Sequence, residues 1–241
     1  MKRIIVVGAS SGMGREVARR FLRERCRVGL AARRVEALEE LRREFPGQVV
    51  TAHIDATSDS ASEALLQLIE QVGGVDLYFH AAGVGWQNTA LDISLELQTV
   101  ATNGMGFTRL VDTIFNYMRA HGGGHIAVIS SIAGTKGLGP APAYSATKAF
   151  QNTYIQALEQ LSNSQRLNIR FTDIRPGFVD TPLLSGHAYP MLMQTEKVAD
   201  DIMKAIKKQK HVRVIDVRYR ILTRLWRSVP GWIWRHLKLA A

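Results

Sequence analysis

The sequence predicts an α/β fold in which a Rossmann-type, doubly wound sheet of about seven mostly parallel strands has helices on both faces. Short apolar runs rich in β-branched residues alternate with helical stretches along the 241 residues, which is the pattern of repeated strand–helix–strand units. A glycine-rich turn directly follows the first apolar run, as it does where the first strand of such a sheet leads into its first helix. We therefore expect one sheet covered by helices.

The expected elements follow one another in strict alternation up to residue 216. Apolar runs predict strands at 3–8, 27–31, 48–53, 75–80, 124–130, 167–173 and 212–216. Helical periodicity predicts helices at 12–25, 34–44, 59–72, 94–121, 142–163 and 195–209. No repeat or Pro/Ser-rich linker divides this part of the chain. We expect residues 1–216 to form one domain and residues 217–241 to form a C-terminal extension that is not a domain of its own.

The composition indicates an ordinary soluble protein. Hydrophobic residues make up 46% and charged residues 22% of the chain, which suits a full core. No apolar run reaches the roughly 18 residues needed to span a bilayer, and the N-terminus enters the first strand without a secretory leader. Cys26 is the only cysteine, so neither a disulfide nor a cysteine-based metal site is expected, and no other metal site is expected. We expect a cytoplasmic location.

The net charge of +10 comes from the last 40 residues, which contain eleven basic side chains and a single acid, Asp216. An apolar stripe at helical spacing predicts an amphipathic, Trp-rich helical tail over 217–241; it consists of Leu222, Leu225, Trp226 and Val229. Such a tail docks on its own body or on a partner subunit, or else it lies on the inner membrane surface. No nucleic-acid recognition motif accompanies the charge, so no nucleic-acid partner is expected.

The glycine-rich turn has the chemistry of a pyrophosphate site. Gly8 suits a tight turn, Gly12 lets the backbone approach a phosphate, and Gly14 permits close packing of the helix. Backbone N–H groups and the positive end of the helix dipole would then hold the anion. We expect the turn to contact a dinucleotide through Gly8, Ser10, Ser11, Gly12, Met13 and Gly14.

Tyr144 and Lys148 stand four residues apart in a predicted helix, a spacing that places both side chains on one face. The pKa of a free tyrosine is about 10, so its phenol is a poor acid or base at neutral pH. A positive charge beside the phenol favours the phenolate and lowers that pKa. The pair therefore indicates acid–base chemistry, although a Tyr-x-x-x-Lys match alone is weak.

Gly-x-x-x-Gly-x-Gly after the first strand, together with Tyr144-x-x-x-Lys148, resembles the short-chain dehydrogenase/reductase family, classical type. Four further motifs stand in the order that this family has. They are Asp55 after the third strand, Asn103 in the long fourth helix, Ser131 thirteen residues before Tyr144, and Arg175-Pro176-Gly177 after the sixth strand. The resemblance covers roughly residues 3–216 and implies an oxidoreductase with a nicotinamide cofactor.

The resemblance implies a role for each of four residues. Tyr144 would be the general acid that protonates a carbonyl oxygen, or the base in the reverse direction. Lys148 would lower the pKa of Tyr144 and bind the nicotinamide ribose. Ser131 would donate to the substrate oxygen and stabilise the developing alkoxide. Asn103 would anchor a water that connects Lys148 to solvent as a proton relay.

The end of the second strand favours NADP(H) over NAD(H). Relatives that prefer NAD carry an acid here, which accepts from the 2′-hydroxyl of the adenosine ribose, and this chain has Ala32. A guanidinium pairs with a 2′-phosphate in fork geometry, so Arg33 is expected to be the main contact and Arg34 a helper. The family's second basic position, in the glycine turn, is Ser11 here, so the preference rests mainly on Arg33.

Further cofactor contacts are implied by the resemblance alone. Asp55, with Ala56 behind it, is expected to accept from the adenine amino group. Ala81-Ala82-Gly83 is expected along the adenine-side ribose. The nicotinamide is expected beside Pro176, Gly177, Val179 and Thr181. His80 stands where relatives usually have asparagine, and we expect it to be structural rather than catalytic.

The substrate pocket is expected over the nicotinamide, behind variable loops at 85–87, 135–140 and 183–193. The candidate wall residues are Trp86, Leu138, Leu184 and Tyr189, with His187, Met191 and Met193 in the last loop. Apolar, flexible side chains suit an adaptable pocket, and they equally suit a cover over the end of the sheet. No charged side chain stands ready for a carboxylate or phosphate, so a neutral carbonyl compound is expected.

Together these residues predict an NADPH-dependent carbonyl reductase or alcohol dehydrogenase. By the same resemblance it forms a homodimer or homotetramer through the helices that carry Asn103 and Tyr144. Two alternatives stay open: a protein that senses NADP(H) and signals to a partner through its tail, and a peripheral membrane reductase of a lipid-like ketone. The four catalytic-type residues speak against a sensor, because a sensor needs no proton donor.

Overall fold

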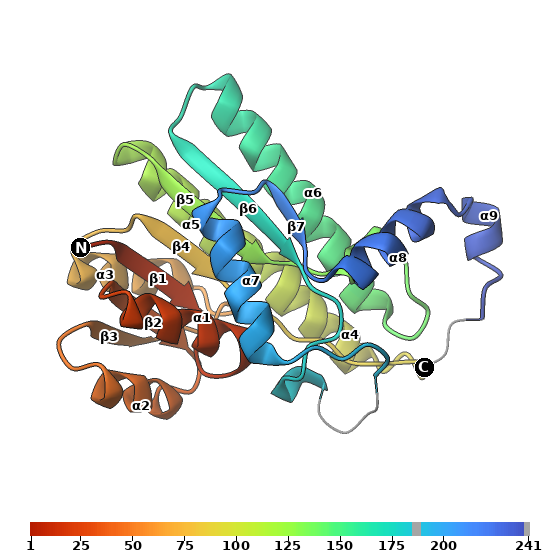
Figure 1. The fold of residues 1–241 in the computed structure, drawn as a ribbon, viewed down its shortest axis with the longest axis horizontal. Helices are drawn as coiled ribbons and strands as arrows, with labels where there is room; N and C mark the ends of the chain where they lie inside the picture. Colours follow the sequence, from red (N-terminus) through yellow and green to blue (C-terminus); the bar gives the residue numbers. More distant parts are fainter. Residues whose placement is uncertain (185–188, 239–241) are drawn as a thin grey trace.

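The computed structural model describes residues 1–184 and 189–238, and seven strands of this part form one sheet. The strands are β1 (Arg3–Val7), β2 (Arg27–Ala32), β3 (Val49–His53), β4 (Leu77–His80), β5 (Gly124–Ile129), β6 (Ile169–Arg175) and β7 (Val212–Val214). Their order is β3-β2-β1-β4-β5-β6-β7, and every neighbouring pair is parallel. The expected doubly wound sheet is confirmed (Figure 1).

Helices cover both faces of the sheet because alternate strand residues are apolar on both sides. Ile4 and Val6 of β1 join the core cluster beneath one helical layer, which consists of α1 (Gly12–Arg23), α2 (Glu36–Glu44) and α7 (Thr195–Lys207). Ile5 and Val7 join the cluster beneath the other layer, which consists of α3 (Ala61–Val72), α5 (Phe107–Ala120) and α6 (Pro142–Ser164). All four β1 side chains are buried.

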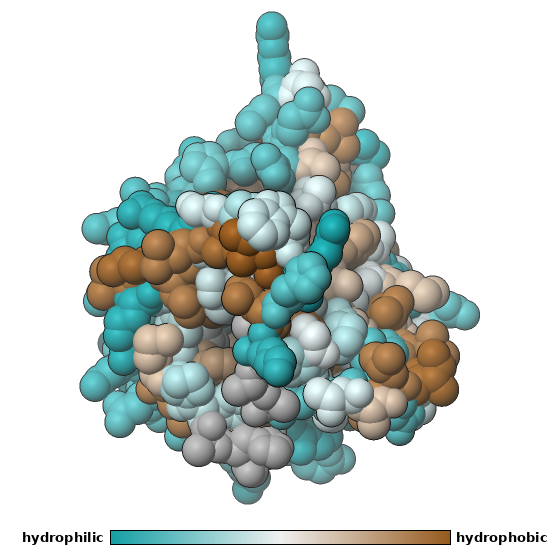
Figure 2. All heavy atoms as spheres, turned by 90° about the vertical axis from the view of Figure 1, so that its right-hand side faces the viewer, coloured by the Kyte–Doolittle hydropathy of each residue, from teal (hydrophilic) through white to brown (hydrophobic). Residues whose placement is uncertain are grey.

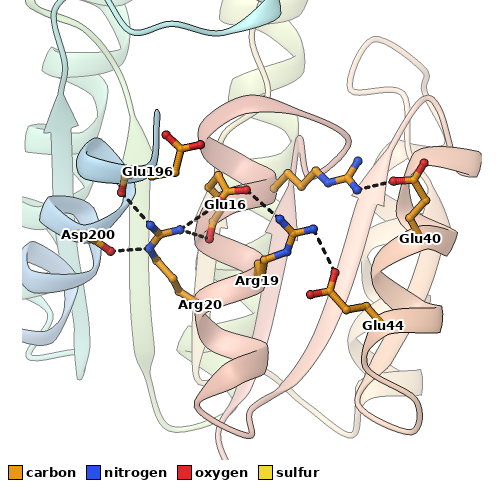
Figure 3. A network of polar contacts seen from close by, with 8 residues as sticks. Glu16, Arg19, Arg20, Glu40, Glu44, Glu196 and Asp200 are labelled. Atoms are coloured by element: carbon orange, nitrogen blue, oxygen red, sulfur yellow. Dashed lines mark hydrogen bonds and ion pairs between the residues drawn. The ribbon is translucent and has the colours of Figure 1, made fainter. Parts of the chain in front are cut away.

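Charged side chains on the outer face of α1 connect this helix to both of its neighbours (Figure 3). Arg20 donates to the carboxylate of Asp200 at 2.7 Å and to the carbonyl oxygen of Glu196 at 2.8 Å, both on α7. Arg19 pairs with Glu44 of α2 at 3.0 Å. Partly exposed ion pairs contribute little stability each, so their main effect is to orient α1, whose N-terminus faces the glycine turn.

The predicted helix at 94–121 is one continuous segment with a wider turn in its middle. It consists of α4 (Ile93–Val100), a π-helical turn at Ala101–Gly106, and α5. An inserted residue in a π turn shifts the faces of the helix that follows, and such turns are frequent at functional sites. Asn103 lies within this turn and is fully buried.

Strand β6 begins two residues later than its sequence pattern predicted. Helix α6 ends in a turn in which Arg166 has a φ of 55° and the N–H of Leu167 donates to the carbonyl oxygen of Ser162 at 2.9 Å. Leu167 and Asn168 therefore belong to the turn. The strand runs on to Arg175, which brings its C-terminal end beside Ser130 and Ser131 after β5.

The tail forms two helices, α8 (Val217–Ser228) and α9 (Gly231–Trp234). Asp216 starts α8, because its carboxylate accepts from the N–H of Arg218 at 2.8 Å. Leu222 and Trp226 of the predicted apolar stripe pack on the core of the body, so the tail docks on its own chain. Leu225 of the same stripe is 60% exposed, so the predicted stripe is divided between a docked and an exposed face.

Candidate active site

The glycine turn lies at the C-terminal ends of β1 and β4, where the strand order changes direction and doubly wound folds bind their ligands. Gly8 has a φ of +87°, and a Cβ there would stand 2.5 Å from the backbone nitrogen of Ala82. A Cβ on Gly14 would stand 2.2 Å from the carbonyl oxygen of Gly8. Only glycines allow this turn to pass so close to the segment after β4.

The turn has the geometry of an anion site. Ser11 is the N-cap of α1 but makes no side-chain capping hydrogen bond, so its side chain does not satisfy the first N–H groups of the helix. A Cβ on Gly12 would approach a methyl group of Thr181 at 3.1 Å, which places Thr181 directly across from the turn. Ser10, Ser11, Gly12 and Met13 are partly exposed. These residues fit a pyrophosphate at a helix N-terminus.

Arg33, Arg34 and Asp55 lie beyond the ends of β2 and β3, on the side of the turn where an adenosine would extend. Both arginines are exposed and neither forms an ion pair with the described residues. The carboxylate of Asp55 accepts from the N–H and hydroxyl of Thr57 at 2.9 and 2.8 Å. The Thr57 hydrogen bonds, and secondarily the charge of Arg33, lower the pKa of Asp55. Ala56 behind it is buried.

Tyr144 stands on the first turns of α6, with its ring against Gly85. A Cβ at Gly85 would stand 2.3 Å from the ring, so this position also needs a glycine. Burial raises the pKa of Tyr144, and a hydrogen bond with Ser131 opposes this rise. The lowered pKa expected from the neighbouring lysine is therefore wrong for this structure, since burial outweighs the favourable contacts. The phenol is held protonated.

Lys148 lies one turn further along α6, and its Nζ is 5.7 Å from the centre of the Tyr144 ring. Its ammonium donates to the carbonyl oxygen of Ile129 at 3.1 Å and to Oε1 of Gln151 at 2.9 Å. The side chain is only 4% exposed. Burial lowers the pKa of Lys148 to about 8, against the opposing charge of Asp173.

Asn103 is held rigidly beside Lys148. Its side chain exchanges two hydrogen bonds with the backbone of Val84, at 2.9 and 2.6 Å, and its amide lies 3.4 Å from the hydroxyl of Thr147. A Cβ on Gly83 would stand 3.2 Å from Oδ1 of Asn103 and 3.7 Å from Nζ of Lys148. The π turn, the segment after β4 and helix α6 therefore meet at this point.

Gln151 completes the contact between Asn103 and Lys148, and sequence reasoning missed it. Its Nε2 donates to the carbonyl oxygen of Asn103 at 2.9 Å while its Oε1 accepts from Lys148, and the side chain is fully buried. The available signal was its position three residues after Lys148, which places both side chains on one helix face.

Asp173 is the second residue that the sequence did not single out. Its carboxylate is 2% exposed, accepts from the hydroxyl of Ser130, and pairs with Arg175 at 2.6 Å. Burial raises the pKa of Asp173, while Arg175 and Ser130 lower it. Its negative charge also raises the pKa of Lys148, against the effect of burial. The neighbouring Ser131 is 6% exposed and accepts from the N–H of Ala133 at 3.0 Å.

His80 has the contacts of a structural side chain. Its Nδ1 lies 2.8 Å from the hydroxyl of Tyr78, and its ring packs edge-on against Phe107 with 5.2 Å between centroids. Burial lowers the pKa of His80 to about 3, and the charge of Lys148 adds to this effect. The imidazole is therefore neutral at physiological pH.

The turn after β6 is fixed by the tail. A Cβ on Gly177 would stand 2.3 Å from the ring of Tyr219 on α8, and the hydroxyl of Tyr219 accepts from the N–H of Phe178 at 3.2 Å. Val179 forms an isolated bridge with Met193, and the hydroxyl of Thr181 donates to the carbonyl oxygen of Val179 at 3.3 Å. The segment from Pro176 to Thr181 thereby runs opposite the glycine turn.

Two of the four candidate substrate residues lie near Tyr144, and the other two lie on the segment after β6. The N–H of Leu138 donates to the hydroxyl of Ser145 at 3.0 Å, and Trp86 follows Gly85 with 36% of its surface exposed. Tyr189 packs on Phe178 with 4.6 Å between ring centroids. Leu184 ends a short helix in which its N–H donates to the carbonyl oxygen of Thr181. His187 falls in 185–188, outside the described residues.

A family model for short chain dehydrogenases matches residues 2–189. An uncharacterized oxidoreductase of Myxococcus xanthus is 34% identical over 235 residues, which cover 94% of this chain and 92% of that protein. The family model's match spans the glycine turn, both serines after β5, and Tyr144 with Lys148. The likeness therefore extends over the whole body of the molecule and over most of its relative.

Solved structures with the same fold include two complexes with nicotinamide cofactors. The alcohol dehydrogenase of Thermococcus sibiricus with 5-hydroxy-NADP is 25% identical with a TM-score of 0.77, and the match covers 89% of this chain and 95% of that one. The 3-ketoacyl-(acyl-carrier-protein) reductase of Brucella melitensis with NADH is 22% identical with a TM-score of 0.78, covering 89% and 96%. The second likeness shows the fold alone.

Proposed function

Because the chain belongs to the short-chain dehydrogenase/reductase family, we propose that it transfers a hydride between NADP(H) and a carbonyl compound or secondary alcohol. The convergence of Ser131, Tyr144, Lys148 and Asn103 beside the glycine turn is the observation that carries this proposal. A bound nicotinamide would supply the hydride. The protein itself would supply a proton donor, a hydrogen-bond donor for the substrate oxygen, and the groups that hold them.

Each of these residues has a role that its environment supports. Burial raises the pKa of Tyr144, so its phenol holds a proton in the free protein, and this is the proton that a general acid would give to a carbonyl oxygen. Ser131 would donate to the same oxygen and stabilise the developing alkoxide. Lys148, a buried cation one turn away, would favour loss of the phenolic proton once a substrate is bound. Asn103 would hold a water that returns the proton from solvent.

The adenosine end supports a preference for NADP(H). Arg33 and Arg34 are exposed and unpaired within the described chain, and a guanidinium suits a 2′-phosphate. Ala32 replaces the acid that would bind the ribose 2′-hydroxyl of NAD. The Thermococcus sibiricus enzyme, which shares the fold, was solved with an NADP derivative. Asp55 would contact the adenine, and Pro176, Gly177, Val179 and Thr181 would border the nicotinamide.

The proposed substrate is a neutral, fairly apolar carbonyl compound. Trp86, Leu138, Leu184 and Tyr189 would form the wall of the substrate pocket, and none of them is charged. Turnover of NADPH with a panel of ketones and aldehydes tests this proposal. A protein that binds NADPH tightly but reduces no member of the panel would favour the sensor alternative instead.

We also propose that two copies of the chain associate through α4 and α6. This face exposes Val100, Met105 and Phe150, at 42%, 64% and 42%, around a shallow groove of about 650 Å³ that also includes Arg109 and Thr147. An exposed apolar patch of this kind is typical of an interaction surface. Because Asn103 lies in the π turn that follows α4 and Tyr144 lies on α6, association would limit movement of the elements that carry the proposed catalytic residues.

A further inference from the structure

The tail is held to the body by one face only. On α8, Tyr219 and Thr223 are buried and Trp226 packs on the core. The residues after α8 are fixed on the loop before α6: Nζ of Lys136 donates to the carbonyl oxygen of Val229 at 3.0 Å, and the indole N–H of Trp234 donates to the carbonyl oxygen of Gly137 at 2.8 Å. The tail is therefore a fixed part of the surface.

The opposite face of α8 presents an apolar stripe to solvent. Val217, Ile221 and Leu225 are 57%, 54% and 60% exposed, and their spacing of four residues puts them in one row. Beyond α8, Trp232 and Leu237 are 69% and 46% exposed. None of these side chains is needed to hold the tail. In Figure 1, α8 and α9 lie at the right-hand end of the molecule. Figure 2 shows the surface of this end, where hydrophobic and hydrophilic areas alternate.

The charges around this stripe are all positive. Exposed basic side chains accompany it at Arg218, Arg224, Arg227, Arg235 and Lys238, and residues 217–238 contain no acid. Arg218 pairs with Asp216 at 2.8 Å, whereas the other four make no ion pair with the described part of the chain. The surface thus combines exposed aliphatic and indole side chains with unneutralised positive charge.

We propose that the exposed face of α8, defined by Val217, Ile221 and Leu225, binds the surface of an anionic lipid bilayer together with its flanking arginines and the exposed Trp232 beyond it. Apolar side chains of this kind enter the acyl boundary, tryptophan favours the headgroup level, and arginines attract anionic headgroups. Within the described residues, no helix is long and apolar enough to cross a membrane. The contact would therefore be peripheral, with α8 lying along the surface.

Two other occupants fit these observations less well. A second copy of the chain docked by twofold symmetry would bring the same unpaired arginines face to face. A nucleic acid would use the charge, but it gives Ile221 and Leu225 no favourable environment. The α4–α6 face, by contrast, is apolar around a single basic side chain, Arg109, and suits a protein partner instead. The charge pattern therefore assigns the two faces to different partners.

Co-sedimentation of the full-length protein with vesicles tests this proposal without any measurement of turnover, so it stands or falls apart from the proposed reaction. We expect binding to vesicles that contain phosphatidylglycerol and at least about tenfold weaker binding to pure phosphatidylcholine. The double variant Ile221→Ser/Leu225→Ser should lose at least about tenfold in vesicle affinity. Arg224→Glu/Arg227→Glu should lose the preference for anionic lipid. Because all four positions are exposed, these variants are expected to fold.

Leu97→Ser is the matched control, since Leu97 is 60% exposed on α4, and it should bind vesicles as the wild type does. Equal sedimentation of the wild type with and without anionic vesicles would overturn the proposal. So would unchanged vesicle binding by Ile221→Ser/Leu225→Ser. If Ile221→Ser/Leu225→Ser still binds duplex DNA as the wild type does, the surface would be assigned to nucleic acid. If the double variant has a lower molecular mass than the wild type in the absence of lipid, the surface would be assigned to a second copy of the chain.

Discussion

Gln151 accepts a hydrogen bond from the Lys148 ammonium at 2.9 Å and donates one to the carbonyl oxygen of Asn103 at the same distance. The amide thereby connects the proposed catalytic lysine to the π turn through two hydrogen bonds in a fully buried site. A hydrogen bond to a buried charge is worth more than one between neutral groups, so this contact positions Lys148 and supports its charged form.

Gln151 variants should move the pKa of Lys148 in opposite directions. Gln151→Leu removes an acceptor and lowers this pKa from about 8 by about one unit or more. Gln151→Glu adds a negative charge and raises it. The alkaline limb of kcat/KM against pH, which reports the free enzyme, should shift down in the first variant and up in the second.

Gln156→Leu is the control for that series, because Gln156 is exposed on the same helix. Its pH profile should match the wild type. Shifts of equal sign in both Gln151 variants would mean that Gln151 acts only through packing and that the positioning role is wrong.

Arg33→Asp should weaken the preference for NADPH. Loss of a charge-assisted hydrogen bond to the 2′-phosphate is expected to raise KM for NADPH by about 10- to 100-fold, and the new carboxylate repels the phosphate further. KM for NADH should fall only when Ala32→Asp is added, because the acid that accepts from the ribose 2′-hydroxyl belongs at position 32. Steady-state kinetics with both cofactors measures the change, and Arg34→Asp should have a smaller effect. Unchanged KM values in Arg33→Asp would contradict the NADP(H) preference.

His80→Asn should make the protein less sensitive to acid. Burial lowers the pKa of His80 to about 3, so between its ordinary value of about 6.5 and about 3 only the unfolded chain takes up the proton. Stability is therefore lost as pH falls through this window, by up to about 1.4 kcal/mol per pH unit from this group. Urea unfolding at several pH values should show a shallower slope in the variant, whereas parallel curves would refute the neutral, buried histidine.

Met105→Glu should weaken association of the chain. A carboxylate placed on the exposed apolar face of α4 and α6 would be buried without a partner if two copies meet there. Light scattering of the wild type should give more than the mass of one chain, and the variant should shift toward one chain at the same concentration. Leu66→Glu on α3, also exposed, is the matched control. A wild type that is already monomeric would contradict this interface.

Most of the fold could be predicted because the apolar runs that build β1 to β7 are short and β-branched, and turns separate them from amphipathic helices. The π turn at Ala101–Gly106 could not, since an inserted helical residue leaves the apolar pattern nearly unchanged. The exposure of Leu225 could not be predicted for a related reason: α8 is apolar on two faces, and spacing alone does not tell which of them docks.

The residues of the candidate site likewise fall into those that the sequence predicted and those that it did not. Tyr144, Lys148, Ser131 and Asn103 were found because a resemblance fixes their spacing along the chain, and the structure places them together. Gln151 and Asp173 were missed because their importance comes from burial and from contacts with residues distant in sequence. The direction of the Tyr144 pKa shift was wrong for the same reason, since a sequence pattern does not show which distant residues surround the phenol.

The most direct test of the proposed reaction is single-turnover oxidation of NADPH by Tyr144→Phe with a carbonyl substrate that the wild type reduces. Loss of the phenolic proton donor should slow the chemical step by about 100-fold or more, while NADPH binding, followed by cofactor fluorescence, stays within a few-fold of the wild type. Wild-type turnover by Tyr144→Phe would contradict the assignment of Tyr144 as the general acid.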